Sequence, residues 1–301
     1  MKELVILSGK GGTGKTSLTA AFAAMTENCL LCDADVDAAD LHLLMQPVIR
    51  QQTDFGGGGI AQIDPQRCTG CGTCIDMCRW SAIGDGFIVD EIDCEGCGVC
   101  VDFCPEQAID FPTKVCGQWF ISDTRFGPMV HARLGIAEEN SGKLVSLVRR
   151  EARNLAEKRN IDLIITDGPP GVGCPVIASV GGATSALIVA EPTVSGIHDM
   201  ARAIELCRHF KVPVMVCINK YDLNVENCTT IEKMTRDGGL PVVGRVPFDP
   251  LFTKAMVQGK TLPEFDGNGT ASDHVRQVWA QIMRTAAMVA DESTTISALN
   301  N

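Results

Sequence analysis

The stretch SGKGGTGKT, residues 8–16, decides the fold of this chain. It contains the pattern G-x-x-x-x-G-K-[ST], follows the apolar run ELVIL (3–7) and opens the helical pattern KTSLTAAFAAMT (15–26). A glycine loop between a strand and a helix presents backbone N–H groups and a helix N-terminus to phosphate. The sequence therefore predicts a P-loop nucleotide site, in which Lys15 reaches the β- and γ-phosphates and Thr16 ligates Mg²⁺.

Length and charge limit the class of protein. The 301 residues suit one large α/β domain, or one such domain with a small insertion. The formal charge is −11, from 26 Lys and Arg against 37 Asp and Glu, and no basic stripe appears, so nucleic-acid binding is not expected. The richest basic stretch, 147–159, alternates with acids and is interpreted as a solvated helix face. No apolar run is long enough for a signal peptide or a membrane span, so a cytosolic protein is expected.

Short apolar runs alternate with helical patterns along most of the chain. This alternation predicts a doubly wound, mostly parallel sheet covered on both faces, the α/β fold of a P-loop NTPase. The expected strands are 3–7, 29–35, 118–122, 161–167, 186–190, 212–219 and 241–247. The expected helices are 141–159, 196–210, 226–237 and 270–290.

The segment between about 51 and 117 breaks this alternation. It begins with FGGGGIAQ (55–62), interpreted as a flexible or sharply turning run, and continues with eight cysteines, acids and glycines. We expect residues 55–117 to form a small inserted ferredoxin-like iron–sulfur domain, and residues 1–54 and 118–301 to form the P-loop domain.

Fifteen cysteines cannot form a disulfide framework in a reducing compartment, so they hold metal or are small buried side chains. Eight of them form two C-x₂-C-x₂-C-x₃-C runs, the bacterial ferredoxin spacing, in which the fourth cysteine of each run ligates the other cluster. The spacing predicts two [4Fe–4S] clusters, and structural zinc is the alternative. The first cluster would take Cys68, Cys71, Cys74 and Cys104. The second would take Cys78, Cys94, Cys97 and Cys100. Arg79 stands where a proline usually follows the fourth cysteine.

A second lysine, Lys10, makes the loop resemble that of the MinD/ParA-type ATPases, the deviant Walker A or SIMIBI class. The whole chain resembles MinD-type ATPases that carry an inserted ferredoxin domain. The resemblance implies ATP hydrolysis with slow intrinsic turnover, and a dimer in the ATP state in which Lys10 reaches the partner's nucleotide. The dimer is formed by two copies of the chain or with a related ATPase.

The resemblance also implies the remaining roles in the nucleotide site. In LLCDADVDAADLH (30–42), Asp35 orients the attacking water and Asp33 supports the Mg²⁺ shell. In IDLIITDGPPG (161–171), Asp167 holds Mg²⁺ and the N–H of Gly168 senses the γ-phosphate. Asn219, in NKYD, contacts adenine, although this pattern also fits guanine recognition. The full expected set of nucleotide-binding residues is Gly9, Lys10, Gly11, Gly12, Thr13, Gly14, Lys15, Thr16, Ser17, Gly168, Asn219 and Pro247.

The other seven cysteines lack metal-ligand spacing, and most are expected to be small buried side chains. Cys174, just past the second switch, is a candidate for a redox or interface role because nitrogenase iron protein carries a cluster cysteine beyond its switch II. The five histidines show no paired metal spacing and are interpreted as structural.

Three functions fit these parts. The first is an ATP-gated electron-transfer module with ATP, Mg²⁺ and two [4Fe–4S] clusters as cofactors. The second is an iron–sulfur or metallocofactor assembly ATPase, and the third is a MinD- or ParA-like spatial organiser. The first two need a redox or cofactor-assembly protein as partner. The C-terminal pattern 274–290 is amphipathic but a poor membrane anchor, so we expect it to cover the sheet.

Overall fold

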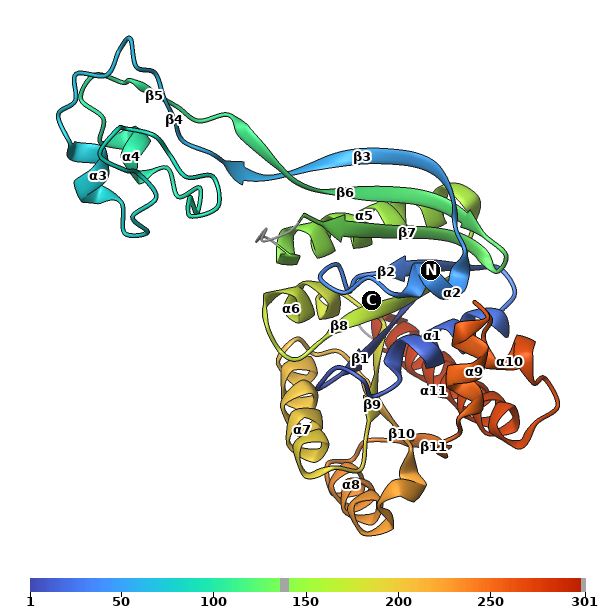
Figure 1. Ribbon diagram of the computed structural model, residues 1–301. Coiled ribbons are helices and arrows are strands. Elements are labelled where there is room, and N and C mark those ends of the chain that lie inside the picture. The colour runs from blue at the N-terminus through green and yellow to red at the C-terminus, as the bar shows by residue number, and fades with distance from the viewer. Residues whose placement is uncertain (136–140, 299–301) are drawn as a thin grey trace. The chain divides into compact units, whose positions relative to one another are not determined.

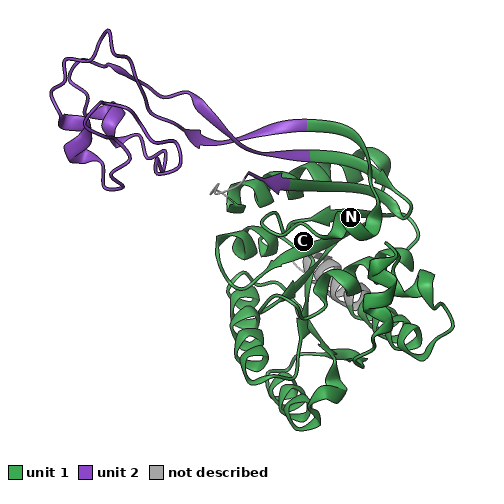
Figure 2. Ribbon diagram, viewed as in Figure 1, with its two compact units in different colours: residues 1–52, 120–132, 141–301 green, residues 53–119, 133–140 purple. Residues whose placement is uncertain are grey.

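The computed structural model describes residues 1–135 and 141–298, with side chains to residue 285 (Figure 1). The chain forms two compact units (Figure 2). The larger unit comprises residues 1–52, 120–132 and 141–301, and the smaller comprises residues 53–119 and 133–140. The segment 55–117, expected from its composition to be an insertion, lies inside the smaller unit.

One nine-stranded sheet runs in the order β11-β10-β9-β1-β8-β2-β7-β6-β3. Its strands are β1 (Lys2–Ser8), β2 (Cys29–Asp33), β3 (Val48–Gly59), β6 (Thr113–Thr124), β7 (Gly127–Leu134), β8 (Leu163–Pro170), β9 (Ser185–Ala190), β10 (Val214–Asn219) and β11 (Val242–Val246). The pairs from β11 through β7 are parallel, which confirms the mostly parallel sheet. Two residues join β6 to β7, a connection that only an antiparallel pair allows.

Helices cover both faces of the parallel part of the sheet (Figure 1). The helices of the larger unit are α1 (Lys15–Ala24), α2 (Leu41–Met45), α5 (Ser141–Arg159), α6 (Cys174–Val180), α7 (Val194–His209), α8 (Val225–Asp237), α9 (Leu251–Val257), α10 (Leu262–Phe265) and α11 (Thr270–Ala298), with a 3₁₀ turn at Tyr221–Leu223. Alternate residues of β1 face opposite cores. Leu4 and Ile6 pack with α1 and α11, whereas Val5 and Leu7 pack with α6, α7 and α8.

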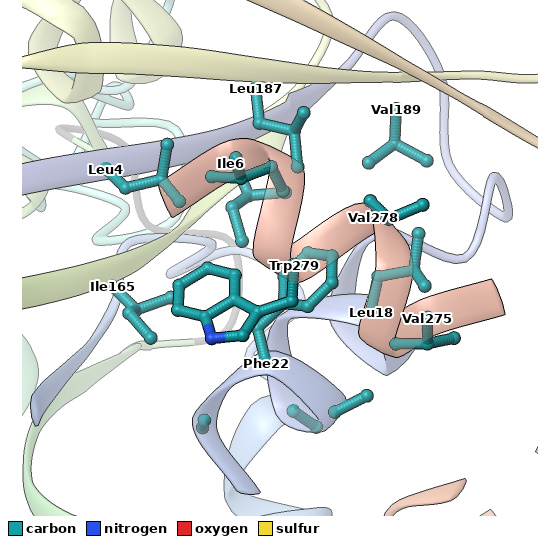
Figure 3. Close-up of a cluster of buried hydrophobic side chains, with 14 of the residues drawn as sticks. Leu4, Ile6, Leu18, Phe22, Ile165, Leu187, Val189, Val275, Val278 and Trp279 are labelled. Atoms are coloured by element: carbon teal, nitrogen blue, oxygen red, sulfur yellow. The ribbon is translucent and has the colours of Figure 1, made fainter. Parts of the chain in front are cut away.

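The C-terminal helix α11 covers the sheet, as its amphipathic pattern predicts. Trp279 stacks on Phe22 of α1, with ring centroids 5.0 Å apart and an interplanar angle of 19° (Figure 3). Val275 and Val278 lie in the same cluster. Burial of each such side chain contributes about 1.5–3 kcal/mol to the free energy of folding. These contacts therefore hold α11 on the face of the sheet that also carries α1.

The basic stretch 147–159 is not simply a solvated face, and that interpretation was wrong for Arg149. This side chain is 5% exposed and donates from Nε and Nη2 to the Glu3 carboxylate on β1. Its Nη1 donates to the carbonyls of Ala178 and Gly181 at the end of α6. The guanidinium therefore ties α5 and α6 to the sheet, and the charge pattern alone could not show this because the partner lies 146 residues away.

The smaller unit is built from two copies of one short pattern. It contains α3 (Thr73–Met77), α4 (Val99–Asp102) and a two-stranded sheet of β4 (Gln62–Ile63) and β5 (Ile109–Asp110). Each helix follows a glycine in the left-handed region, Gly72 with φ 81° and Gly98 with φ 75°. The apolar centre holds Ala61, Ile83 and Ile109 together with several of the eight cysteines.

The four-glycine run is neither flexible nor a sharp turn, and that expectation was wrong. Its residues complete strand β3, which extends through Gly59. A Cβ on Gly59 would lie 2.4 Å from the Phe111 ring, and one on Gly56 would lie 2.5 Å from Thr113 Cγ2. Glycine is therefore needed here for close packing between neighbouring segments.

Candidate functional site

The P-loop connects β1 to α1 at the carboxyl edge of the sheet. Gly12 and Gly14 have φ of 80° and 88°, and α1 begins at Lys15 directly after Gly14. Gly9 packs against α7, because a Cβ there would lie 2.2 Å from Asp199 Cβ. The loop therefore has the strand–glycine–helix form that phosphate binding requires.

A cavity of about 420 Å³ lies over this loop. It is lined by Ser8, Gly11, Gly12, Thr13, Gly14, Lys15, Thr16, Ser17, Asp35, Ala38, Asp40, Pro170, Asn219, Lys220, Pro247, Phe248, Asp249, Phe252, Thr253 and Met256. Its size is typical of a small-molecule site, and its position at the carboxyl ends of parallel strands is where α/β sheets bind ligands.

One end of the cavity holds a cation among carboxylates. Lys15 Nζ lies 2.8 Å from Asp167 Oδ1 and 3.4 Å from Asp35 Oδ2. The Thr16 hydroxyl donates to Asp167 Oδ2 at 2.7 Å, and Asp33 pairs with Asp167 in register across β2 and β8. The structure thus brings Lys15, Thr16, Asp33, Asp35 and Asp167 together, but not Lys10 or Gly168, which the resemblance also assigns to the phosphates.

The electrostatics of this group favour an added cation. Burial raises the pKa of Asp33 well above its usual range, and the neighbouring Asp167 raises it further. Burial opposes the charge of Lys15, but Asp167 and Asp35 outweigh this effect, so the pKa of Lys15 lies above its ordinary value. Asp33 Oδ2 is buried without a hydrogen-bond partner. Hydroxyl and carboxylate oxygens are the donors Mg²⁺ prefers, so Thr16, Asp33 and Asp167 fit a magnesium site.

Lys10 points away from this cavity. Its Nζ lies 3.2 Å from the Thr193 hydroxyl, 3.4 Å from the Ser195 hydroxyl and 3.8 Å from Glu191 Oε2. These groups surround the N-terminus of α7. Lys10 and Gly9 are therefore placed outside the cavity of their own chain, whereas the loop residues from Gly11 to Ser17 line it.

The opposite end of the cavity has an apolar wall. Phe248 in the loop VPFDP (246–250), and Phe252 and Met256 on α9, line the cavity. From the sequence, only Pro247 is identified here, because the α9 pattern carries no motif. Two aromatic residues at and just after this loop, Phe248 and Phe252, were an available signal. Flat apolar side chains of this kind suit a nucleobase face.

Asn219 braces the P-loop from the end of β10. Its Nδ2 donates to the carbonyl of Thr13 at 2.7 Å, and Lys220 Nζ donates to the carbonyl of Gly12 at 2.8 Å. Asp222 accepts the backbone N–H of Phe248 and does not line the cavity. Gly168 also lies outside the cavity, packed within β8 against Leu7.

The eight paired cysteines line two separate cavities in the smaller unit. One is lined by Cys68, Cys71, Cys74 and Cys104, and the other by Cys78, Cys94, Cys97 and Cys100. Each cavity therefore takes three cysteines from one run and the fourth from the other run.

Backbone donors repeat in the same way. Ala82 N–H donates to Cys78 Sγ at 3.4 Å, and Ala108 N–H donates to Cys104 Sγ at 3.3 Å. Three neighbouring cysteines contribute to the electrostatics of the Cys100 thiol, whose pKa burial raises. Each of the two cavities is lined by four sulfurs and has one N–H···S hydrogen bond, an arrangement that fits a cluster such as [4Fe–4S]. Over the described residues, no group of three or more His, Cys, Asp or Glu side chains is arranged so that it could hold a metal ion.

Cys174 is exposed at the start of α6 and lies against Gly142. The six remaining cysteines outside the two runs, at positions 29, 32, 116, 207, 217 and 228, are buried. His131 is buried beside Ser122 and stacks on Phe120. Within the part of the chain that the structure describes, no helix is both long enough and apolar enough to cross a membrane.

The fold and the loop define a P-loop nucleotide-binding protein of the α/β class. The family model for the CobQ/CobB/MinD/ParA nucleotide binding domain matches residues 4–262, and the chain belongs to this family. This match confirms the MinD/ParA-type resemblance that Lys10 indicates.

Similar proteins cover the chain to different extents. An uncharacterized protein of Methanocaldococcus jannaschii, MJ0578, is 31% identical over 93% of this chain and 96% of its own length. The cytosolic Fe-S cluster assembly factor nubp2 of Xenopus laevis is 27% identical over 42% of this chain and 53% of its own length. The MinD structure from Pyrococcus horikoshii with Mg-ADP is 15% identical, covers 96% of this chain and 98% of its own, and has a TM-score of 0.59. The last likeness concerns the fold alone.

Proposed function

We propose that this protein is an ATPase whose nucleotide state controls electron transfer through two [4Fe–4S] clusters. The observation that carries the proposal is that one chain combines a P-loop cavity with two cavities, each lined by the interleaved set of four cysteines. The presence of both features in one chain favours coupling between nucleotide and redox chemistry.

In the nucleotide cavity, Lys15 neutralises the β- and γ-phosphates, and Thr16, Asp33 and Asp167 hold Mg²⁺. The 2.8 Å contact between Lys15 and Asp167 supports this assignment. On binding, phosphate would take the place of the Asp167 carboxylate beside Lys15, and Mg²⁺ would take the place of Lys15 beside Asp167. Asp35 lines the cavity, and burial raises the pKa of its carboxyl. A carboxylate with a raised pKa is suited to orient the attacking water and accept its proton.

The base is proposed to be adenine. In the N-K-x-D pattern the aspartate reads guanine, but here Asp222 is engaged by the Phe248 N–H and lies outside the cavity lining. Phe248 and Phe252 supply stacking surface, and Asn219 holds the loop. Under this proposal Asn219 supports the P-loop and does not contact the base, which differs from the role that the resemblance implies.

In the smaller unit, the two sets of four thiolates hold the clusters, which supply one-electron redox chemistry when bound. The chain's own contribution is to keep the sulfurs in place through the left-handed glycines before α3 and α4 and through the Ala82 and Ala108 N–H donors. Such hydrogen bonds to sulfur stabilise added negative charge and so tune the reduction potential.

Coupling is proposed to run through a dimer that closes around ATP. The position of Lys10 outside its own cavity supports this idea, since a lysine that serves a partner's nucleotide must project from its own loop. The dimer is formed by two copies of the chain or with a related ATPase.

A redox titration of anaerobically purified protein with ATP and with ADP tests the proposal. The expected result is a cluster potential that shifts between the two nucleotides, and the shift should vanish in Lys15→Ala. Identical potentials with both nucleotides would overturn the electron-transfer function while leaving nucleotide binding intact.

An assembly or carrier ATPase for iron–sulfur clusters is the second candidate, because nubp2, a cytosolic Fe-S cluster assembly factor, matches 42% of this chain. The two functions differ in which protein holds the clusters at the end of the reaction. A carrier loses its cluster to an apo-acceptor in the presence of ATP, whereas an electron carrier keeps its iron under the same conditions. Iron counted on each protein after separation decides between them.

A further inference from the structure

The smaller unit is the acidic part of the chain. Residues 53–119 contain 11 Asp and Glu and three Lys and Arg, a formal charge of −8 out of −11 for the whole chain. One of the three bases, Arg67, is engaged by Asp64 and Asp110 at 2.7 Å each. This unit therefore presents a strong negative field to any approaching molecule.

Large apolar side chains are exposed within this acidic surface, and three of them share one location. Trp80 is 56% exposed, Phe111 is 38% exposed and Val99 is 36% exposed. All three line the cavity of Cys78, Cys94, Cys97 and Cys100, together with the exposed Glu95. An exposed tryptophan beside two further apolar side chains, with the Glu95 carboxylate beside them, has the composition of a protein interface with an apolar centre and a charged edge.

We propose that Trp80, Val99 and Phe111, with Glu95 at their edge, form a docking surface for a protein whose own surface is apolar at its centre and rich in Lys and Arg around it. This inference rests on the proposed function, because the surface borders the second set of four cysteines. We call it the Trp80 surface.

The negative charge of residues 53–119 favours a basic protein over three other possible occupants of this surface. Nucleic acid and anionic membranes carry the same sign as residues 53–119 and are repelled. A second copy of this chain would bring two acidic units together. A basic protein surface gains from the field during approach and from burial of Trp80 on contact.

The test uses the oxidised full-length protein and ferric cytochrome c as a lysine-rich probe, with binding measured by calorimetry at low and high salt. Cytochrome c with acetylated lysines is the matched probe of the same shape. We expect binding that weakens with salt and is lost with the acetylated probe. Trp80→Ala and Val99→Ser should each weaken binding about tenfold, the scale of a central interface residue.

Two control variants separate the surface from the general charge and apolarity of the unit. Asp85→Lys changes the unit's charge as Glu95→Lys does, and Ile88→Ala removes an exposed side chain from the groove beside Cys68. Glu95→Lys should weaken binding about threefold or more beyond Asp85→Lys, and Ile88→Ala should have no effect. Equal losses in the paired variants, or equal binding of the acetylated probe, would overturn the proposal.

Two further readouts make the outcomes distinct. Iron and sulfide are measured in every preparation, so a protein without clusters contradicts the proposed function, whereas the binding pattern alone decides the docking surface. Sedimentation without the probe tests self-association. A dimer that Trp80→Ala abolishes would identify a second copy as the occupant and would overturn the basic-partner proposal.

Discussion

Lys15 Nζ lies 2.8 Å from Asp167 Oδ1, and the other oxygen of that carboxylate accepts the Thr16 hydroxyl at 2.7 Å. One carboxylate on β8 therefore holds both P-loop side chains that are proposed to bind phosphate and magnesium. Asp167 is 1% exposed, so its charge requires these partners. Binding of Mg-nucleotide would transfer Lys15 to phosphate and supply Mg²⁺ in its place.

Lys15→Ala should weaken ADP binding at least tenfold, since charge-assisted hydrogen bonds contribute about 1.5–3 kcal/mol each. Titration with a fluorescent ADP analogue measures the affinity. Lys260→Ala, which changes an exposed lysine outside the cavity, is the control and should bind normally. An unchanged affinity in Lys15→Ala would contradict the assignment of the phosphate site.

Lys10→Ala should separate binding from turnover. Because Lys10 contacts Thr193 and Ser195 instead of lining its own cavity, ADP affinity should be retained. Hydrolysis of ATP should fall by about a hundredfold or more if Lys10 stabilises transition-state charge in the partner's site. Light scattering with ATP should show loss of the dimer. Normal turnover by a monomeric Lys10→Ala protein would exclude action across a dimer.

Asn219→Ala tests whether this side chain supports the loop or reads the base. Its Nδ2 donates to the Thr13 carbonyl at 2.7 Å, so its removal should weaken ADP and GDP binding by the same factor, about tenfold. Competition titrations with both nucleotides measure this. A loss confined to ADP would instead show that Asn219 recognises adenine.

His131 should make stability depend on pH. Burial, with a smaller contribution from His42, lowers the pKa of His131 to about 4 from 6.5. Between these values the unfolded chain binds the proton and the folded chain does not, so the free energy of unfolding should fall as the pH decreases below 6.5. The loss reaches about 2 kcal/mol by pH 5.

Urea unfolding at pH 7.5 and pH 5.0, followed by circular dichroism, measures this effect. His131→Gln should lose less stability between the two pH values than the parent protein. His198→Asn, at an exposed position, should behave like the parent. Equal pH dependence in all three proteins would show that His131 does not carry the effect.

The sequence predicts the parallel sheet because its signals are local. The run from Lys2 to Ser8 is apolar, a glycine loop follows and a helix begins, so each step is visible within a few residues. The same holds for the two sets of four cysteines. The ferredoxin spacing predicts that each set takes three cysteines from one run and the fourth from the other run. These are the parts for which a short pattern has one structural solution.

Other features depend on partners far along the chain. The hairpin of β6 and β7 was missed in part because Gly127–Leu134 mixes polar and apolar residues without a clear period. The four glycines before Ile60 looked like a flexible run, but Phe111 and Thr113 require their small size. Phe252 and Met256 were missed because they belong to α9, whose pattern carries no motif, and Phe248 was missed although it directly follows Pro247.

Iron and acid-labile sulfide in the anaerobically purified or reconstituted chain test the central claim most directly. The account predicts about eight of each per chain, with a brown colour, and about half as many when Cys94 and Cys97 are replaced by Ala. A colourless protein that contains two zinc ions and no sulfide would contradict it.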